Sequence, residues 1–336
     1  MLKISLLHNT VFSWWRSAGR VLPWREKYAV PVSLNREKVF ADYFASSLRR
    51  DPYRVIVAEM MLQQTQVDRV VLKYQSWIHT WPSTGALSKA SLAEVLIFWQ
   101  GLGYNRRAKF LWQLAQQIEQ KNGVWPTTEA ELLKLPGIGK YTARAVMSFA
   151  FGMQVGVVDT NIKRVIGRTQ GIEWKEKQVL PAINLKTDYF QAADQLLPKD
   201  QADPWNQAIM DLGAMICTAK SPKCTICPVN HLCQSNLQAQ DQGWKQYSDW
   251  LKKTEQSRKV SEGRVKKKAI RFEETDRFFR GRIMDFLRVS SYKSAKLAKK
   301  MEAEFGLTEQ ERFQKILTAL KSEGLVSIIE DTVQLG

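Results

Sequence analysis

All four cysteines of this 336-residue chain lie in one stretch, CTAKSPKCTICPVNHLC, at positions 217–233. The start of the chain has no signal-peptide pattern, so we expect a reducing intracellular compartment in which disulfides are disfavoured. Four clustered thiols then indicate either a zinc site or an iron–sulfur cluster. Zinc ribbons usually present two C-x2-C pairs, whereas this segment has one such pair with an outer cysteine on each side. The spacing therefore favours a compact loop around a cluster, held by Cys217, Cys224, Cys227 and Cys233.

Two acidic residues in apolar surroundings could transfer a proton and stabilise a positive charge. Glu59 lies within the apolar segment AEMMLQQTQV. Burial disfavours the charged form of a carboxyl group, so we expect Glu59 to hold and deliver a proton near neutrality. Asp159, in VVDTNIKRV, follows an apolar run at a place where aspartate can cap a helix. A hydrogen-bonded structural glutamate and a simple helix cap are the alternatives.

A Pro-Gly motif, LPGIGKYTARAVMSFAFG, indicates a turn between two helices at residues 135–152. Gly137 and Gly139 allow a tight turn that a Cβ atom would obstruct, and the following helix opens with exposed N–H groups that could seat a phosphate. The chain carries 50 Lys and Arg against 33 Asp and Glu, a net charge of +17. Such a surplus suits a nucleic-acid backbone or an anionic surface. A plain connector between helices is the alternative reading of the turn.

The pattern along the chain predicts the elements that must position these residues. From Asp51 to about Gln234, apolar residues repeat at helical spacing, and no apolar run approaches the roughly eighteen residues of a membrane span. Residues 26–50 read as an insertion, and residues 239–274 as a basic linker. Residues 275–336, with Thr275 as the expected N-cap, predict three helices and a hairpin. This is a winged-helix pattern, with a small helical cap as the alternative.

The cysteine segment and the residues before it, NQAIMDLGAMICTAKSPKCTICPVNHLC, resemble the cluster-binding end of helix-hairpin-helix DNA glycosylases related to endonuclease III. The resemblance is closest to the MutY-type adenine glycosylases and covers about Phe12 to Cys233, apart from the insertion. It implies an all-α, two-lobed fold with a structural [4Fe–4S] cluster. The implied domains are the cluster domain at 1–25 and 156–238 and a six-helix barrel with the hairpin at 51–155.

The resemblance also implies the catalytic roles. N-glycosidic cleavage needs one group that protonates the leaving base and another that stays anionic beside the sugar. Glu59 matches the family acid, Asp159 the stabilising carboxylate, and Asn161 the residue that supports it. Tyr141 stands where bifunctional relatives carry a nucleophilic lysine, which implies a monofunctional enzyme. Lys140 is adjacent, but one residue turns a helical side chain by roughly 100°.

Further residues match family positions that contact DNA. Arg20 and Trp24 match a motif that lines the base pocket, although Trp24 could equally be ordinary core. The remaining matches are Leu62, Gln63, Gln64 and Tyr104 at the opened base step, Gly137, Gly139 and Lys140 at the hairpin, and Lys220 and Lys223 beside the cysteines. We expect these groups to meet duplex DNA that contains a mismatch or an oxidised guanine.

Two departures from the family pattern leave the opposing base open. Asn105 stands where MutY-type enzymes usually carry a tyrosine that wedges beside 8-oxoguanine, and no Nudix-like C-terminal domain is apparent. We therefore expect a monomeric cytoplasmic or nucleoid enzyme, without membrane attachment, that flips and removes adenine opposite 8-oxoguanine or guanine. The alternatives are a thymine–guanine mismatch glycosylase and a non-catalytic damage-binding regulator.

Overall fold

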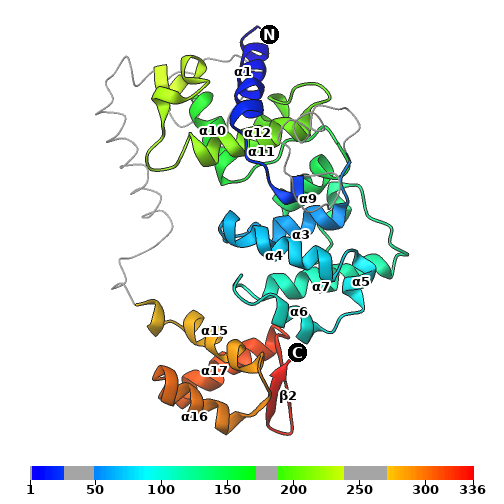
Figure 1. The fold of residues 1–336 in the computed structure, drawn as a ribbon, viewed down its shortest axis with the longest axis vertical. Helices are drawn as coiled ribbons and strands as arrows, with labels where there is room; N and C mark the ends of the chain where they lie inside the picture. The colour runs from blue at the N-terminus through cyan, green and yellow to red at the C-terminus, as the bar shows by residue number, and fades with distance from the viewer. Residues whose placement is uncertain (1, 26–48, 172–187, 238–270) are drawn as a thin grey trace. The chain divides into compact units, whose positions relative to one another are not determined.

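The computed structural model of the chain describes residues 2–25, 49–171, 188–237 and 271–336. Most of the predicted insertion (residues 26–48) and most of the predicted basic linker lie outside the described residues. Figure 1 shows the helices and strands along the chain, which divides into two compact units. Unit 1 comprises Met1–Val55, Pro126–Lys134 and Ile138–Gly263, and unit 2 comprises Ile56–Trp125, Leu135–Gly137 and Arg264–Gly336.

Unit 1 is helical throughout its described part. Its α-helices are α1 (Leu2–Ala18), α8 (Glu129–Leu132), α9 (Lys140–Phe149), α10 (Thr160–Thr169), α11 (Tyr189–Gln195) and α12 (Ala202–Met215). Short 3-10 turns are η1 (Pro23–Arg25), η2 (Cys224–Ile226) and η3 (Asn230–Leu232).

Helix α12 is the centre of unit 1, because α1, α9 and α10 all pack against it. Eleven of its fourteen residues are buried, which is the pattern of a helix surrounded by protein on all sides. Gly213 lets α10 approach closely, since a Cβ atom there would lie 2.7 Å from the Cβ of Asn161. The helix that Asp159 caps is thereby held against the core of the unit.

Unit 2 begins within α3 (Pro52–Leu62), whose first turn belongs to unit 1. The helices that follow are α4 (Val67–Thr80), α5 (Thr84–Ser88), α6 (Leu92–Phe98) and α7 (Arg106–Glu119). Trp77 and Trp99 are fully buried, with ring centroids 5.6 Å apart in an edge-to-face arrangement. Ser91 and Glu94 form a capping box that fixes the start of α6.

The C-terminal part of unit 2 is a small mixed module. Its elements are η4 (Phe272–Glu274), α15 (Asp276–Leu287), β1 (Tyr292–Lys293), α16 (Ser294–Phe305), α17 (Gln310–Ser322), β2 (Val326–Ile329) and β3 (Thr332–Leu335). The strands form an antiparallel sheet in the order β1-β3-β2. Thr275 accepts a hydrogen bond from the Phe278 N–H, as the sequence predicts for the N-cap. The expected winged-helix-like arrangement is present, with β1 as an additional strand.

The module packs on the helices of the same unit. Strand β3 contacts α6, and the Arg288 side chain donates to the Leu96 carbonyl (3.1 Å) and to Asn105 Oδ1 (3.0 Å). Lys109 donates from α7 to the Glu323 carbonyl (2.6 Å). Asn105 is thus held by the C-terminal module. Separately, no described helix has both the length and the apolar character needed to span a membrane.

Candidate catalytic and cluster-binding sites

Asp159 is the N-cap of α10, and its carboxylate is held by residues of the same helix. Oδ1 accepts from the Ile162 N–H (2.6 Å) and Oδ2 accepts from Asn161 Nδ2 (2.8 Å). Burial raises the pKa of Asp159 above its ordinary value, whereas these hydrogen bonds and the charge of Arg164 oppose that rise. Asn161 therefore lies where the sequence places it, in direct contact with the carboxylate.

A chain of hydrogen bonds continues from Asp159 to the cysteine loop. Arg164 donates to Asn161 Oδ1 (2.8 Å), to the Cys217 carbonyl (2.6 Å) and to the Gly213 carbonyl (2.6 Å). Arg168, one turn further along α10, donates to the Cys217 sulfur (3.4 Å). The sequence prediction did not include these two arginines. Within the local sequence, the one sign of their role is that they follow the capping aspartate at i, i+4 spacing. Their shared partner, Cys217, lies about fifty residues away.

Glu59 lies in the middle of α3 and is buried, with 5% of its surface exposed. Its neighbours Ala58, Met60 and Met61 are also buried. The burial of Glu59 that the sequence predicts is therefore present. Glu59 belongs to unit 2, whereas Asp159, Asn161 and Tyr141 belong to unit 1, where Tyr141 lies in the first turn of α9, half-buried.

The two hairpin glycines differ in what the fold requires of them. Gly137 has a φ of +74°, and a Cβ atom there would lie 2.8 Å from side-chain atoms of Met60 and Phe110. Glycine is therefore required at this position. The expectation that a Cβ atom at Gly139 would obstruct the turn is wrong, because Gly139 has an ordinary φ of −101° as N-cap of α9 and a Cβ would meet no atom within 4 Å. The space in front of Gly139 is open.

Lys140 is directed towards α11. Its ammonium lies 4.2 Å from the ring centroid of Phe190 and 3.9 Å from Asp188 Oδ2. The ammonium group of Lys140, the residue before Tyr141, therefore contacts residues at the start of α11. This placement agrees with the rotation expected from one residue of shift along α9.

Arg20 and Trp24 lie at the N-terminal edge of unit 1. Arg20 Nε pairs with Asp211 Oδ1 (2.7 Å), and Arg25 donates both terminal nitrogens to the same carboxylate (2.8 Å each). Although burial alone would raise the pKa of Asp211, the Arg25 and Arg20 guanidinium groups hold it well below its usual range. Trp24 is buried, as its alternative reading as core predicts. Sequence reasoning missed Asp211, because its partners Arg20 and Arg25 are 191 and 186 residues away in the chain.

Arg107 binds the two backbone segments that carry the residues predicted for the opened base step. Its guanidinium donates to the carbonyls of Met60 (2.6 Å), Gln63 (2.5 Å) and Leu102 (2.9 Å). Burial lowers the pKa of Arg107 to about 10. Arg107 thus ties the end of α3 to the α6–α7 loop, which positions the half-buried Leu62 and Gln63 and the exposed Gln64 and Tyr104. The sequence prediction did not include this arginine.

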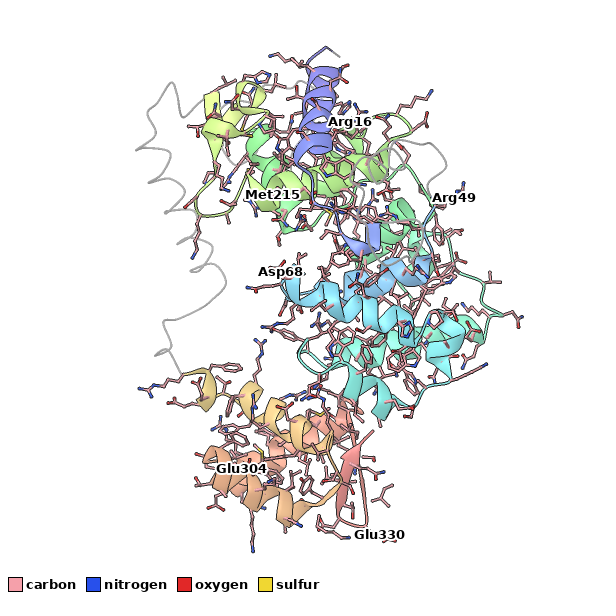
Figure 2. All side chains as sticks on the ribbon, in the orientation of Figure 1. Arg16, Arg49, Asp68, Met215, Glu304 and Glu330 are labelled. Atoms are coloured by element: carbon pink, nitrogen blue, oxygen red, sulfur yellow. The ribbon has the colours of Figure 1, made fainter. Side chains whose placement is uncertain are left out.

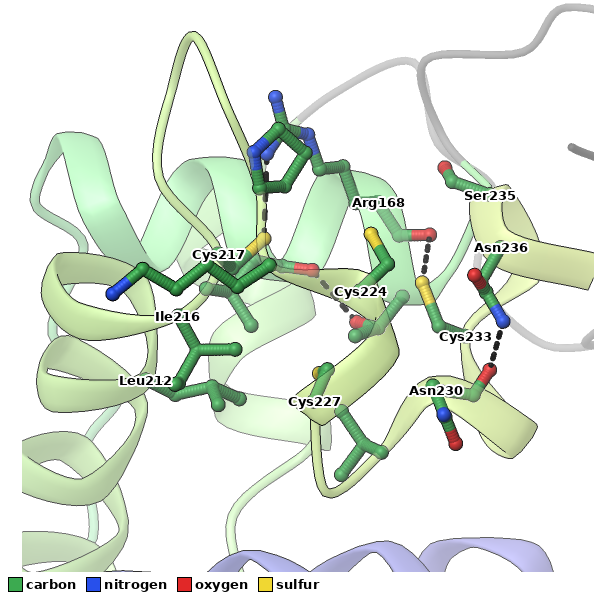
Figure 3. A pocket seen from close by; sticks show the side chains of 15 residues that line it. Arg168, Leu212, Ile216, Cys217, Cys224, Cys227, Asn230, Cys233, Ser235 and Asn236 are labelled. Atoms are coloured by element: carbon green, nitrogen blue, oxygen red, sulfur yellow. Dashed lines mark hydrogen bonds between the residues drawn. The ribbon is translucent and has the colours of Figure 1, made fainter. Parts of the chain in front are cut away.

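The four cysteines line one pocket with Arg168, Leu212 and Ile216 (Figure 3). All four are half-buried free thiols. Burial raises the pKa of Cys227 to about 11 and that of Cys233 to about 12, and the neighbouring thiols add to both shifts. Cysteines with such raised pKa values need a cation to become thiolate ligands, which the iron of a cluster supplies.

All four thiols belong to residues that line this pocket. Among the described residues, no three His, Cys, Asp or Glu side chains converge on a position for a single metal ion. This donor set suits a multi-atom cluster with cysteine ligands. Lys220 and Lys223 are exposed on the same loop.

Comparison with known families identifies the class of protein. Residues 57–186 match the family described as HhH-GPD superfamily base excision DNA repair protein, and residues 217–233 match the iron-sulfur binding domain of endonuclease III. The chain is a helix-hairpin-helix base-excision repair protein, and the predicted fold class and [4Fe–4S] cofactor are confirmed. It is also 38% identical to the adenine DNA glycosylase of Mycolicibacterium smegmatis over 283 residues. The matched residues cover 84% of this chain and 80% of that protein. The chain therefore belongs to the adenine DNA glycosylase family, as the resemblance predicts.

Two other similarities define the extent of the match. The adenine DNA glycosylase of Buchnera aphidicola is 34% identical over 234 residues, which cover 69% of this chain and 59% of that protein. The chain thus spans about three fifths of the length of this relative. A solved thermostable thymine-DNA glycosylase is 28% identical, with a TM-score of 0.57 over 70% of this chain and 97% of that structure.

Proposed function

We propose that the chain is a monofunctional DNA glycosylase that flips a mispaired adenine out of duplex DNA and hydrolyses its N-glycosidic bond. The observation that carries this proposal is the pair of unlike carboxyl environments. Glu59 is buried within α3, whereas Asp159 accepts hydrogen bonds that favour its charged form. A proton donor and a persistent anion are the two groups that cleavage through an oxocarbenium-like sugar requires.

In this mechanism, Glu59 protonates the adenine as the base leaves and then helps to activate water. Asp159 stays anionic beside the sugar and stabilises its positive charge, while Asn161 fixes the orientation of the carboxylate. Tyr141 has no amine, and Lys140 is turned towards Phe190, so water rather than a lysine attacks the sugar. The product is an abasic site in an uncut strand.

DNA contact and the cofactor follow from the same reading. The open space at Gly139 and the N-terminus of α9 offer N–H groups to a phosphate, and the exposed Lys220 and Lys223 offer charge. Cys217, Cys224, Cys227 and Cys233 hold the [4Fe–4S] cluster, which when bound supplies a fixed, charged anchor for their loop. Cysteines must stay reduced to bind the cluster, so we propose that the protein acts in a reducing compartment. We propose that it acts there as a monomer.

A single-turnover assay tests the function on three duplexes, with adenine opposite 8-oxoguanine, adenine opposite guanine, and thymine opposite guanine. We expect base release from the two adenine duplexes and no strand cleavage until alkali is added. The second candidate, thymine removal, is favoured by the similarity to the thymine-DNA glycosylase. Release only from the thymine duplex would select it, and binding without release from any duplex would select a damage-binding role.

A further inference from the structure

The first residue of the hairpin helix, Lys140, has an acidic neighbour on another helix of unit 1. Exposed cations of this unit such as Arg49 extend outward from the ribbon (Figure 2). The ammonium of Lys140 instead lies 3.9 Å from Asp188 Oδ2 and 4.2 Å from the ring centroid of Phe190, at the start of α11. The side chains of Lys140 and Asp188 are 45% and 56% exposed. An anion from solution can therefore reach the same ammonium.

The two carboxylate oxygens of Asp188 have different partners. Asp188 is the N-cap of α11, and its Oδ1 accepts a hydrogen bond from the Phe190 N–H (3.0 Å). Oδ2 is the oxygen that faces Lys140. The cap thus fixes the carboxylate where its second oxygen meets the ammonium. An asparagine at this position would keep the capping oxygen and lose the charge.

A second cation of α9 makes a useful contrast with Lys140. Arg144 contacts the same Phe190 ring, at 5.4 Å, but it also forms ion pairs with Glu129 (3.1 Å) and with Asp194. Its side chain is only 9% exposed. Among the described residues, Lys140 has one carboxylate partner and keeps nearly half of its side chain in solvent. Arg144 is therefore fixed within the fold, whereas Lys140 is held by a surface pair that can exchange partners.

The hairpin is the place where the proposed function puts a DNA phosphate. The space in front of Gly139 is open, and α9 begins at the next residue. A phosphate at the first N–H groups of α9 lies within reach of the long Lys140 side chain. Because phosphate and carboxylate are both anions, such a phosphate competes with Asp188 for the ammonium.

We propose that Asp188 competes with the DNA backbone for Lys140 and thereby limits the affinity of the enzyme for duplex DNA. The proposal rests on the proposed function, because it needs DNA at the start of α9. In the free protein, Asp188 neutralises Lys140. On binding, Lys140 exchanges the carboxylate for a phosphate, and departure of the DNA restores the pair. Asp188 therefore favours release of the product once the base is removed.

The test measures binding of the whole protein to a product analogue, a duplex with a tetrahydrofuran abasic site opposite guanine. We expect Asp188→Asn to tighten the dissociation constant about fivefold at low salt, the upper range of a surface ion pair. Most of this change should be a slower dissociation rate. The affinity should also fall more steeply with salt, because Lys140 then meets the DNA without first leaving an ion pair. Fluorescence anisotropy and stopped-flow dissociation measure these quantities.

A double-mutant cycle tests whether Asp188 acts through Lys140. In a Lys140→Gln background, Asp188→Asn should change the dissociation constant by less than about twofold, because the group for which Asp188 competes is absent. Equal tightening with and without the lysine would overturn the proposal and leave a general effect of charge. A change of less than about twofold in the unaltered background would also overturn it.

Asp200→Asn is the matched control, because it removes one negative charge at another exposed position of unit 1. It should leave binding within about twofold, and tightening equal to that of Asp188→Asn would contradict competition at Lys140. Circular dichroism should show that all variants are folded, as expected for an asparagine cap. Failure of the proposed function is seen separately, as absent base release by the unaltered protein from adenine duplexes.

Discussion

At the scale of single residues, Asp159 has two separable tasks. It caps α10 through the Ile162 N–H, and it offers a negative charge that Asn161 orients. Burial raises its pKa, so the anion is lost at a higher pH than for an exposed aspartate. The hydrogen bonds from Asn161 and Ile162 oppose this rise in pKa. The start of a helix therefore favours the charged form of Asp159, because its N–H groups are available as donors.

Substitutions at Asp159 separate the cap from the charge. Asparagine caps helices as well as aspartate, so Asp159→Asn should change the free energy of unfolding by less than about 1 kcal/mol. It should nevertheless slow base release by about 10²–10³-fold, because an oriented charge is lost. Single-turnover rates and urea unfolding measure the two effects. Asp159→Ala is the comparison, and it should lose the cap as well as the rate. Normal turnover in Asp159→Asn would reduce Asp159 to a cap.

At the scale of elements, the hairpin glycines make a clear contrast. Gly137 combines a positive φ with a filled Cβ position, whereas Gly139 combines an ordinary φ with open space. One turn motif thus contains a glycine that the fold needs and a glycine that only an approaching ligand would need. The sequence shows both as the same residue.

Alanine at each glycine tests this distinction. Gly137→Ala should lower the free energy of unfolding by about 1–3 kcal/mol, since it strains the backbone and crowds Met60 and Phe110. Gly139→Ala should leave stability within about 1 kcal/mol and weaken binding to duplex DNA, because the methyl group fills the phosphate approach. Thermal unfolding and fluorescence anisotropy measure these outcomes. Unchanged DNA affinity in a stable Gly139→Ala protein would contradict a phosphate contact there.

These elements also show which features a sequence can predict. Asp159, Asn161 and Thr275 act on groups within three residues, so their roles follow from local patterns. Helical periodicity likewise predicts the C-terminal helices. The link from Arg164 to Cys217, and that from Arg288 to Leu96, join segments far apart in the chain and depend on how helices pack. The open space at Gly139 is likewise a property of its three-dimensional surroundings.

At the scale of the molecule, two aspartates of α12 form ion pairs that hold other segments of unit 1. Asp211 joins α12 to the N-terminal segment through Trp15, Arg20 and Arg25, which are separated from it by 186 to 196 residues. Asp203 pairs with Arg50, so a second segment is fastened to the same helix. Helix α12 therefore holds both described segments that flank residues 26–48.

Neutralising Asp211 should weaken unit 1 strongly. Asp211→Asn leaves two guanidinium groups without their buried carboxylate, and we expect a loss of about 3–5 kcal/mol in the free energy of unfolding. The folded pKa of Asp211 lies below its unfolded value, so its stabilisation is present above about pH 4 and is lost as the pH falls further. Chemical denaturation between pH 3 and 7 measures both effects. Asp200→Asn, at an exposed position of the same unit, is the control. Equal stability of the two variants would contradict the role of Asp211.

The docking of β3 and α15 on the helices of unit 2 has a mechanical consequence. Arg288 joins α15 to Leu96 and to Asn105, which stand on either side of the α6–α7 loop. Anything that displaces the C-terminal module therefore pulls on this loop, whereas Asp159 lies in the other unit.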